Sequence, residues 1–208
     1  AVRNPCRVAT AWLAALGIDA PDDQPAIAAC DETERSVVRR QVATGVGCVP
    51  TTSVGRLFDV VASLLGVRHR VEFEAQAAIE LEALAATTAA VSLRLPVDRG
   101  VFDTGQLVRD LLDAQQRGVA AAELAAAFHH AIARAVADAV ESVAARIGRR
   151  RVALTGGVFQ NALLHGLTVS LLTDAGHEVL THRLVPANDG GLSLGQAVVA
   201  ARTQWGGG

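Results

Sequence analysis

The sequence predicts an α/β protein in which residues 1–90 are mainly helical and residues 91–208 form a subdomain of alternating strands and helices. Apolar residues recur every three or four positions through most of the first part. In the second part, short apolar runs followed by glycine pairs mark strand-to-helix turns. At 208 residues and 50% hydrophobic, the chain is long enough to bury a sizeable core.

Three helical segments are predicted in the N-terminal portion. They read "CRVATAWLAALG", "DETERSVVRRQVAT" and "GRLFDVVASLLG", and each keeps its apolar positions three or four residues apart. Glycine or proline stands between them, which is typical of helix ends.

The middle of the chain is expected to contain a first strand and two helices. "AVSLRLPVD", near residues 90–98, alternates apolar and polar residues and predicts the strand. "FDTGQLVRDLLDAQQRG" follows as a helix, with Asp103 or Thr104 as its N-cap. "AAELAAAFHHAIARAVADAVESVAARIG" predicts one long helix with a single buried stripe. The stripe consists of Phe128, Ile132, Val136, Val140, Val143 and Ile147. Its adjacent His129 and His130 point in different directions on a helix, so we interpret them as structural rather than as joint metal ligands.

The end of the chain has the order strand, helix, strand, helix. The strands are "RVALT" and "EVLTHRLV", residues 158–175 form the helix between them, and "PANDGGLSLGQAVVAARTQW" carries the last helix. Ligands gather at the carboxyl ends of strands in α/β sheets. We therefore expect both strands in one sheet, with Gly156, Gly157 and Asp189 at the same edge.

Two turns contain glycine pairs. In "LTGGVFQNALL", Gly156 and Gly157 precede a helix whose first amides have no partner inside the helix, which suits a phosphate or carboxylate. A tight, closely packed turn is the alternative, since the stretch is neither a GxGxxG fingerprint nor a P-loop with its lysine. In "PANDGG", Asn188 or Asp189 caps the last helix, or Asp189 holds a divalent metal ion bound to a nucleotide.

Two further stretches gather polar side chains. "TTSVGRLFDVVASLLG" sets Ser53, Arg56 and Asp59 around a glycine before a hydrophobic helix. "EFEAQAAIELEALA" clusters glutamates around Gln76, a pattern most typical of a solvated helix face.

The composition argues against several classes of protein. A net charge of −2 and 3% aromatic residues give no basis for nucleic-acid binding. No run reaches the ~18 apolar residues of a membrane span and no cleavable leader is recognisable, so we expect a cytoplasmic protein. Cys6, Cys30 and Cys48 lack CxxC spacing, so neither a disulfide framework nor a zinc site is expected. The chain starts inside a helical pattern without Met, and we expect it to be part of a longer protein.

Five motifs resemble one protein family and follow its order. "TTSVGRLFDVVASLLG", "EAQAAIELEALA", "AFHHAIA", "LTGGVFQNALL" and "PANDGGLSLGQA" resemble the C-terminal part of HypF, the carbamoyltransferase of nickel–iron hydrogenase maturation. The resemblance covers nearly the whole chain. It implies the helix-rich C-terminal half of an actin-like (ASKHA) nucleotide-binding domain similar to the TsaD threonylcarbamoyl-transferases. The acylphosphatase, zinc-finger and YrdC-like domains of the family are expected upstream.

The resemblance also implies a set of site residues. Nucleotide binding falls to Asp59, Glu80, Gly156, Gly157 and Asn161, possible ligand contacts are Ser53, Arg56 and Gln76, and the metal ligand is Asp189. By resemblance, the glycine amides bind the phosphates of ATP or a carbamoyl-adenylate, and Asn161 binds the nucleotide from the first turns of its helix. Asp59 and Glu80 accept hydrogen bonds from ribose hydroxyls. The family's other metal ligands, an HxxxH histidine pair, are absent, because no two of the 6 histidines are four apart. Ala75 replaces a family glycine, so crowding of a ligand or conflict with a positive φ is expected there.

The implied activity is carbamoyl transfer. The enzyme would use carbamoyl phosphate and ATP to form carbamoyl-adenylate and pass the carbamoyl group to the C-terminal cysteine of a HypE-like acceptor protein. This chain alone is expected to be inactive. The alternatives are an O-carbamoyltransferase, a tRNA threonylcarbamoyl-transferase relative, and a non-catalytic module that binds a nucleotide or a partner.

Overall fold

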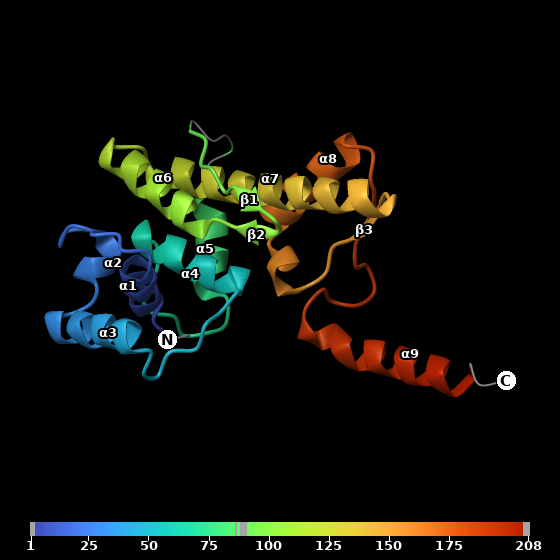
Figure 1. Ribbon diagram of the computed structural model, residues 1–208, viewed down its shortest axis with the longest axis horizontal. Helices are drawn as coiled ribbons and strands as arrows, with labels where there is room; N and C mark the ends of the chain where they lie inside the picture. The colour runs from blue at the N-terminus through green and yellow to red at the C-terminus, as the bar shows by residue number, and fades with distance from the viewer. Residues whose placement is uncertain (1–2, 86, 88–90, 206–208) are drawn as a thin grey trace. The chain divides into compact units, whose positions relative to one another are not determined.

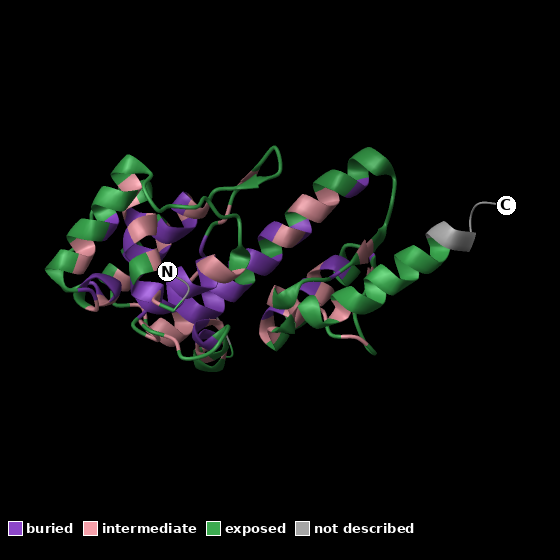
Figure 2. Ribbon diagram, turned by 90° about the horizontal axis from the view of Figure 1, so that it is seen from below, coloured by how far each residue is buried: buried purple, intermediate pink, exposed green. Residues whose placement is uncertain are grey.

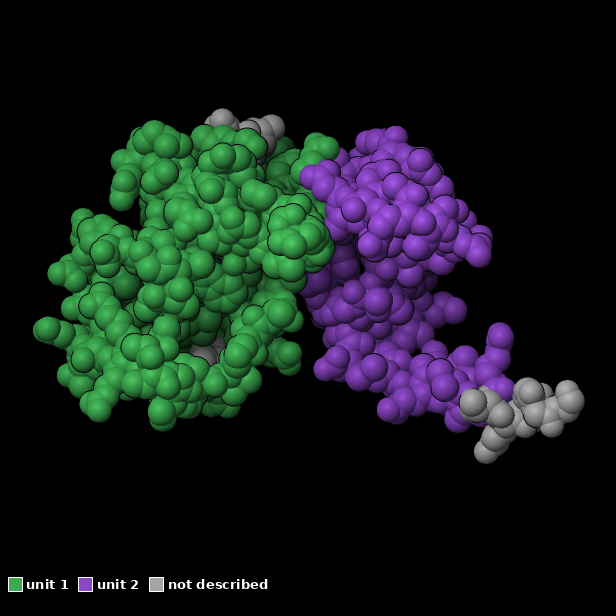
Figure 3. Space-filling view, viewed as in Figure 1, with its two compact units in different colours: residues 1–135 green, residues 136–208 purple. Residues whose placement is uncertain are grey.

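The computed structural model describes residues 3–85, 87 and 91–205 (Figure 1). It consists of two compact units, residues 1–135 and residues 136–208, shown in two colours in Figure 3. The units meet inside a long helix, whereas the sequence-based division at residue 90 follows the change in secondary structure. No helix in the described ranges is long and apolar enough to cross a membrane.

Unit 1 is built mainly from helices, as the sequence predicts. They are α1 (Pro5–Ala15), α2 (Pro25–Ala28), α3 (Glu32–Thr44), α4 (Val54–Leu64), α5 (Gln76–Leu84), α6 (Thr104–Gln116) and the start of α7 (Ala121–Ile147). The three helices expected from the N-terminal periodicity correspond to α1, α3 and α4, so these predictions are confirmed.

Helix α4 lies at the centre of unit 1. Helices α1, α2 and α5 pack against it, and every residue from Leu57 to Leu64 is buried. Figure 2 shows this core in purple. Phe58 meets Phe128 of α7 edge to face, with ring centroids 4.8 Å apart, a favoured geometry for aromatic pairs. A helix buried on all sides is expected to be apolar on all sides, so the charged Asp59 within this stretch needs an explanation.

The strand predicted near residues 90–98 is wrong in its extent. Within residues 91–98, the strand is limited to β1 (Val97–Asp98), which pairs antiparallel with β2 (Val101–Phe102) in a short hairpin. The amide of Arg94 donates to the side chain of Asp110, 3.2 Å away, instead of to a strand. The alternation of apolar and polar residues before β1 therefore reflects how an irregular segment packs, and does not indicate a strand. Residue 90 lies outside the described residues.

Helices α6 and α7 confirm the sequence prediction in most respects. The Asp103 side chain accepts the amide of Gln106 at 3.0 Å, so Asp103 rather than Thr104 is the N-cap of α6. Helix α7 runs for 27 residues, as predicted, but its buried stripe is not continuous. Val143 and Ile147 are 43% and 59% exposed.

Small residues of α7 are buried where the predicted stripe of large apolar residues is not. Ala137 belongs to the core of unit 2, together with Leu154 and Leu172, and Val140 packs against that core. Ala144 is also buried. The second half of α7 thus buries a face rich in alanine, which a pattern based on large apolar residues does not detect.

Unit 2 contains a β-α-β arrangement followed by a last helix. Strand β3 (Arg151–Ala153) pairs in parallel with β4 (Glu178–Leu180), and η1 (Gly157–Gln160) and α8 (Ala162–Asp174) connect them. The predicted common sheet is confirmed. Both strands are shorter than predicted, and a 3₁₀ turn replaces the start of the predicted helix. The turn η2 (Asp189–Gly191) leads into α9 (Leu192–Trp205).

Candidate functional site

The first glycine-containing turn follows β3. Gly156 has φ 102°, a backbone conformation that residues with a side chain rarely adopt. Its amide donates to the carbonyl of Ala187 at 2.7 Å, and a Cβ on Gly157 would lie 3.8 Å from the Cβ of Asn188. The two glycine-containing turns therefore lie side by side next to the ends of β3 and β4. This confirms the predicted placement of Gly156, Gly157 and Asp189 at one edge.

The amides of this turn are not equivalent. Because the Gly156 amide is bonded to Ala187, it does not point at an open site, contrary to the expectation that both glycines offer amides to phosphates. Gly157 begins η1, and the first amides of a helical turn have no acceptor inside the turn. Phosphate binding by this turn would thus depend on the amides from Gly157 onward.

Asn161 is the N-cap of α8. Its Oδ1 accepts the amide of Leu164 at 2.7 Å, so the residue lies before the helix and not in its first turns as expected. This capping hydrogen bond orients the carboxamide of Asn161 between the first glycine-containing turn and helix α8.

Asn188 is the cap in the second turn. Its Oδ1 accepts the Gly190 amide at 3.0 Å, and its Nδ2 donates to Gln160 at 3.2 Å, which ties the second turn to η1. A Cβ on Gly191 would lie only 2.9 Å from the carbonyl oxygen of Pro186, so the close backbone approach requires glycine there. Asp189 is exposed and is not needed as a cap.

The structure gives Asp189 no metal-binding partners of its own. Among the residues that the structure describes, no group of three or more His, Cys, Asp and Glu side chains could hold a metal ion. A resident metal ion therefore does not fit the described residues of this chain taken alone.

A hollow of about 440 Å³ adjoins the first turn. His165 of α8 and His182 of the loop after β4 contribute to its lining. The Nε2 of His182 lies 3.1 Å from the Oγ1 of Thr155. Thr155 and His182 are not among the residues predicted from the sequence. Each lies two residues after a strand, β3 or β4, at the same edge of the sheet, and this position was the available signal.

The other group of predicted residues belongs to unit 1. Asp59 is only 3% exposed, and its Oδ2 lies 2.5 Å from Nη1 of Arg56. Burial raises the pKa of Asp59 to about 6, and the charge of Arg56 opposes this rise. Arg56, predicted as a ligand contact, thus directly contacts another predicted site residue. Ser53 lies at the N-terminus of α4, exposed and without a capping hydrogen bond from its side chain.

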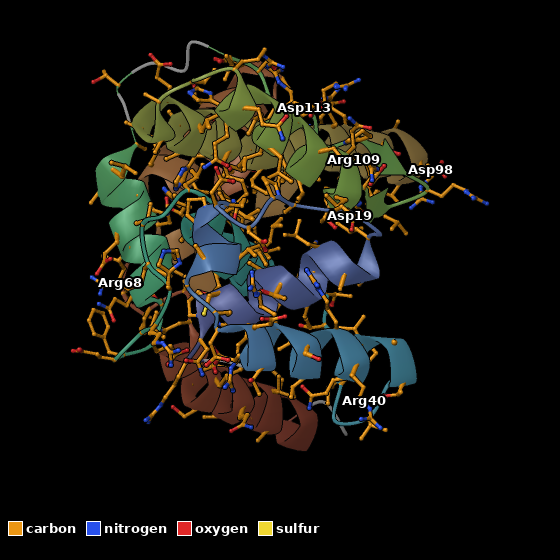
Figure 4. The ribbon with its side chains drawn as sticks, turned by 90° about the vertical axis from the view of Figure 1, so that its left-hand side faces the viewer. Asp19, Arg40, Arg68, Asp98, Arg109 and Asp113 are labelled. Carbon is orange, nitrogen blue, oxygen red and sulfur yellow. The ribbon has the colours of Figure 1, made fainter. Side chains whose placement is uncertain are left out.

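Glu80 lies on α5 and is held from two sides. Arg68, labelled in Figure 4, donates from Nε to Oε2 and from Nη2 to Oε1, each at 2.7 Å. Gln76 donates to Oε1 at 2.9 Å. The hydrogen bonds from Arg68, followed by that from Gln76, lower the pKa of Glu80, so this carboxylate stays charged. Of the residues expected to form a solvated face, Gln76 and Glu80 instead belong to a hydrogen-bonded network, whereas Glu72 and Glu74 are exposed as expected.

Ala75 has φ 61° and precedes α5. The methyl group of Ala75 therefore does not exclude the positive φ, although it makes this conformation unfavourable. The left-handed conformation costs a non-glycine residue roughly 1 kcal/mol. The side chain of Gln76 is nevertheless held by two hydrogen bonds. Its Oε1 accepts from the amide of Glu72 at 2.8 Å, and its Nε2 donates to Glu80.

Comparisons with known proteins agree with this arrangement. Residues 1–196 match the family model described as carbamoyltransferase, Kae1-like domain, second subdomain. The chain belongs to the HypF carbamoyltransferase family. It is 42% identical to carbamoyltransferase HypF of Rhodobacter capsulatus over 80% of this chain and 22% of that protein. It is 37% identical to carbamoyltransferase HypF of Rhizobium leguminosarum over 96% of this chain and 26% of that protein.

A solved HypF structure shares the fold. A crystal structure of full-length HypF in the phosphate- and nucleotide-bound form matches 99% of this chain with a TM-score of 0.84 and 31% identity, and the match covers 27% of that chain. The predicted α/β, helix-rich, actin-like class is thereby confirmed for this HypF-type chain, which spans about a quarter of the length of these relatives.

Proposed function

We propose that this chain forms part of the nucleotide site of a HypF-type carbamoyltransferase that activates a carbamoyl group with ATP. The observation that carries the proposal is the junction of the two glycine-containing turns. Gly156 bonds to Ala187, and Asn188 bonds to Gln160, so η1 and Asp189 open at the carboxyl ends of two parallel strands. This is the edge at which α/β proteins bind nucleotides.

The proposed reaction proceeds in two stages. Carbamoyl phosphate first loses its phosphate group to water, and an oxygen of the resulting carbamate attacks the α-phosphate of ATP, so that pyrophosphate leaves and carbamoyl-adenylate forms. The thiolate of the C-terminal cysteine of a HypE-like acceptor then attacks the carbamoyl carbon, a C–S bond forms, and AMP leaves. The amides that begin with Gly157 would stabilise negative charge on the phosphates, which requires no nucleophilic side chain from this chain.

Two carboxylates of unit 1 are proposed to bind the ribose. Each carboxylate oxygen accepts hydrogen bonds, and a ribose offers a pair of hydroxyl donors. Glu80 is kept charged by Arg68 and Gln76, and Asp59 by Arg56, so both are acceptors near neutral pH. Asp189 is proposed as one ligand of a metal ion whose remaining ligands lie outside the described residues.

Nucleotide binding by the chain tests the proposal. We expect calorimetry to detect weak ATP binding with magnesium and weaker binding with a chelator. Gly191→Ala should abolish the binding, because its Cβ would meet the Pro186 carbonyl at 2.9 Å and displace the turn. Gly166→Ala is the matched control, because a Cβ at Gly166 on α8 meets nothing within 4 Å.

The outcomes distinguish the alternatives. Binding that Gly191→Ala removes and Gly166→Ala preserves supports the site. Absence of ATP binding under both metal conditions would overturn it and favour a non-catalytic partner-binding module. Nucleotide binding together with carbamoylation of a hydroxyl acceptor or of tRNA, instead of a protein thiol, would favour the other carbamoyl-transfer classes.

A further inference from the structure

Arg56 and Asp59 form an ion pair at the edge of the buried core of unit 1. They are three residues apart on α4, so their side chains lie on the same side of the helix. Nη1 and Oδ2, 2.5 Å apart, are both enclosed, and neither makes a hydrogen bond. Arg56 thus meets one oxygen of the carboxylate. In the described part of the chain, no hydrogen-bond donor reaches the other oxygen, Oδ1.

The charge of Asp59 depends on a balance between burial and Arg56. Burial raises the pKa of Asp59 to about 6, and the nearby guanidinium lowers it. A buried carboxyl group without an opposite charge takes up a proton and becomes a hydrogen-bond donor at that oxygen. Removal of the guanidinium would therefore convert Asp59 from an acceptor into a neutral acid near pH 7.

Charged residues of the helices next to α4 form ion pairs with groups other than Asp59. On α1, Arg7 pairs with Glu34 of α3. On α5, Glu80 pairs with Arg68. Helix α2, the third neighbour of α4, contains no charged residue. None of these groups supplies a positive charge to Asp59.

The neighbouring histidines do not supply one either. His69 lies 3.0 Å from Ser63 through its Nδ1, and burial lowers its pKa. His129 of α7 bonds through Nδ1 to the Ala125 carbonyl at 2.7 Å, and burial lowers its pKa despite the opposing charge of Glu82 on α5. Both imidazoles are therefore neutral near pH 7. Within the described residues, Arg56 is the cation that acts on Asp59.

We propose that Arg56 is a positioning residue for Asp59: it holds Oδ2 and keeps the buried carboxylate charged, so that Oδ1 accepts a ribose hydroxyl. This inference rests on the proposed nucleotide site. It assigns Arg56 a different role from that of a ligand contact, because its Nη1 is directed at the carboxylate. Arg56 is 23% exposed at its side chain and also lines a large groove beside α1 and α3, so its outer edge reaches solvent while its inner edge holds Asp59.

The titration of the Asp59 carboxyl group tests the charge-holding role directly. We would follow its carbon-13 signal by NMR in the 208-residue chain. In Arg56→Gln, the midpoint should rise by at least one pH unit, because the neutral amide cannot offset the burial of the carboxylate. In Arg56→Lys, the ammonium should restore most of the wild-type midpoint. Arg35→Gln is the matched control, because Arg35 pairs with the exposed Asp22 and its loss should leave the midpoint unchanged.

A second measurement separates this role from simple support of the fold. Arg56→Gln/Asp59→Asn carries no buried charge and should fold even if the single variant does not. If Arg56→Gln does not fold but the double variant does, this result would also support the pairing of Arg56 with Asp59. An Asp59 midpoint that is the same in wild type and Arg56→Gln would overturn the proposal.

The ligand-binding arm uses ATP with magnesium between pH 5 and 8. Wild-type affinity should rise through about pH 6 as Asp59 ionises. In Arg56→Gln, a midpoint about one unit higher leaves roughly half of the Asp59 carboxyl groups charged at pH 7, so the affinity should fall about twofold there, approach a tenfold loss at about pH 5, and recover at higher pH. A shifted NMR midpoint with pH-independent ATP binding would overturn the ribose contact and hence the positioning role. Absence of ATP binding by the wild type at every pH would overturn the proposed nucleotide site, whereas the NMR titration would still decide whether Arg56 holds the charge.

Discussion

Arg68 and Glu80 form a two-pronged ion pair in which both carboxylate oxygens accept from one guanidinium at 2.7 Å. Such a planar pair fixes the orientation of the carboxylate as well as its charge. Gln76 adds a third bond to the same group. Because the ion pair is partly open to solvent, we expect its main effect to be on the direction of the acceptor oxygens and only a minor effect on stability.

Replacement of Arg68 by lysine tests this distinction. Lysine keeps the charge but cannot hold both oxygens. We expect Arg68→Lys to weaken ATP binding about tenfold while changing the free energy of unfolding by less than about 1 kcal/mol. Calorimetry and urea unfolding measure the two effects. Arg94→Lys is the matched control, because Arg94 holds both oxygens of Asp110 at 2.8 Å outside the proposed site. Equal losses of affinity in both variants would contradict a specific role of Arg68.

Asp59 should make the stability of the chain fall as the pH rises. Burial raises its pKa in the folded state to about 6, above the value of an unfolded chain, so the folded state binds the proton more tightly. The contribution is greatest below about pH 4 and is lost as the pH rises through about 6. A shift of roughly two units corresponds to about 3 kcal/mol at most. In urea unfolding, Asp59→Asn should lack this decline, and parallel pH curves for the two proteins would contradict the raised pKa.

Ala75 offers a stabilising substitution. Its φ of 61° strains an alanine but not a glycine. We expect Ala75→Gly to raise the free energy of unfolding by about 0.5 kcal/mol, since the relief of strain exceeds the entropy that the extra glycine adds to the unfolded chain. Ala83→Gly, on the exposed side of α5, should lower it by about 1 kcal/mol. Thermal unfolding of both variants measures these effects, and a loss of stability in Ala75→Gly would refute the strain.

Some of these relationships could be predicted from the sequence and others could not. The parallel pairing of β3 with β4 and the meeting of the two turns follow from local periodicity and from the general rule for strand ends, and both are present. The pairing of Arg56 with Asp59 could have been suggested by their three-residue spacing. The burial of this ion pair could not be predicted, because it depends on how α1 and α5 pack around α4.

Which residue caps the second turn also could not be predicted from the sequence. Both Asn188 and Asp189 are residue types that cap helices, and only the backbone path places the side-chain Oδ1 of Asn188 at the Gly190 amide. Likewise, the glycine pair suggests two open amides, but the approach of Ala187 to Gly156 is a tertiary contact between turns about 30 residues apart.

The two neighbours Asn188 and Asp189 should respond differently to replacement by alanine. Asn188→Ala removes the bonds to Gly190 and Gln160 and should lower the free energy of unfolding by about 1 kcal/mol. Asp189→Ala should leave stability unchanged, because its side chain is exposed, and should remove the magnesium dependence of ATP binding. Urea unfolding and calorimetry with and without magnesium test this division. Unchanged magnesium dependence in Asp189→Ala would mean that Asp189 is not a metal ligand.

Carbamoyl transfer should require more than this chain. The chain spans 22% and 26% of two HypF relatives, and its family model describes a second subdomain. Catalysis requires reacting groups held within fractions of an ångström, and the proposed reaction involves groups from outside this subdomain. Asp189 is the predicted metal ligand of this chain, and the described residues contain no group of three or more side chains that could hold a metal ion. One carboxylate holds a divalent ion only weakly unless phosphates and water complete the coordination.

We therefore expect the purified chain to bind ATP weakly and to transfer no carbamoyl group. Incubation with ATP, carbamoyl phosphate, magnesium and a HypE-like acceptor should leave the acceptor's C-terminal cysteine unmodified in mass spectrometry. A full-length HypF relative, assayed in parallel, is the positive control and should add one carbamoyl group to that cysteine. Leu192, Leu194, Val198 and Val199 of α9 are exposed and should favour self-association, so the assay is run on the size-selected monomer. Transfer by the chain at a rate comparable to that of the relative would show that the site described here is complete and that histidine ligands from elsewhere are dispensable.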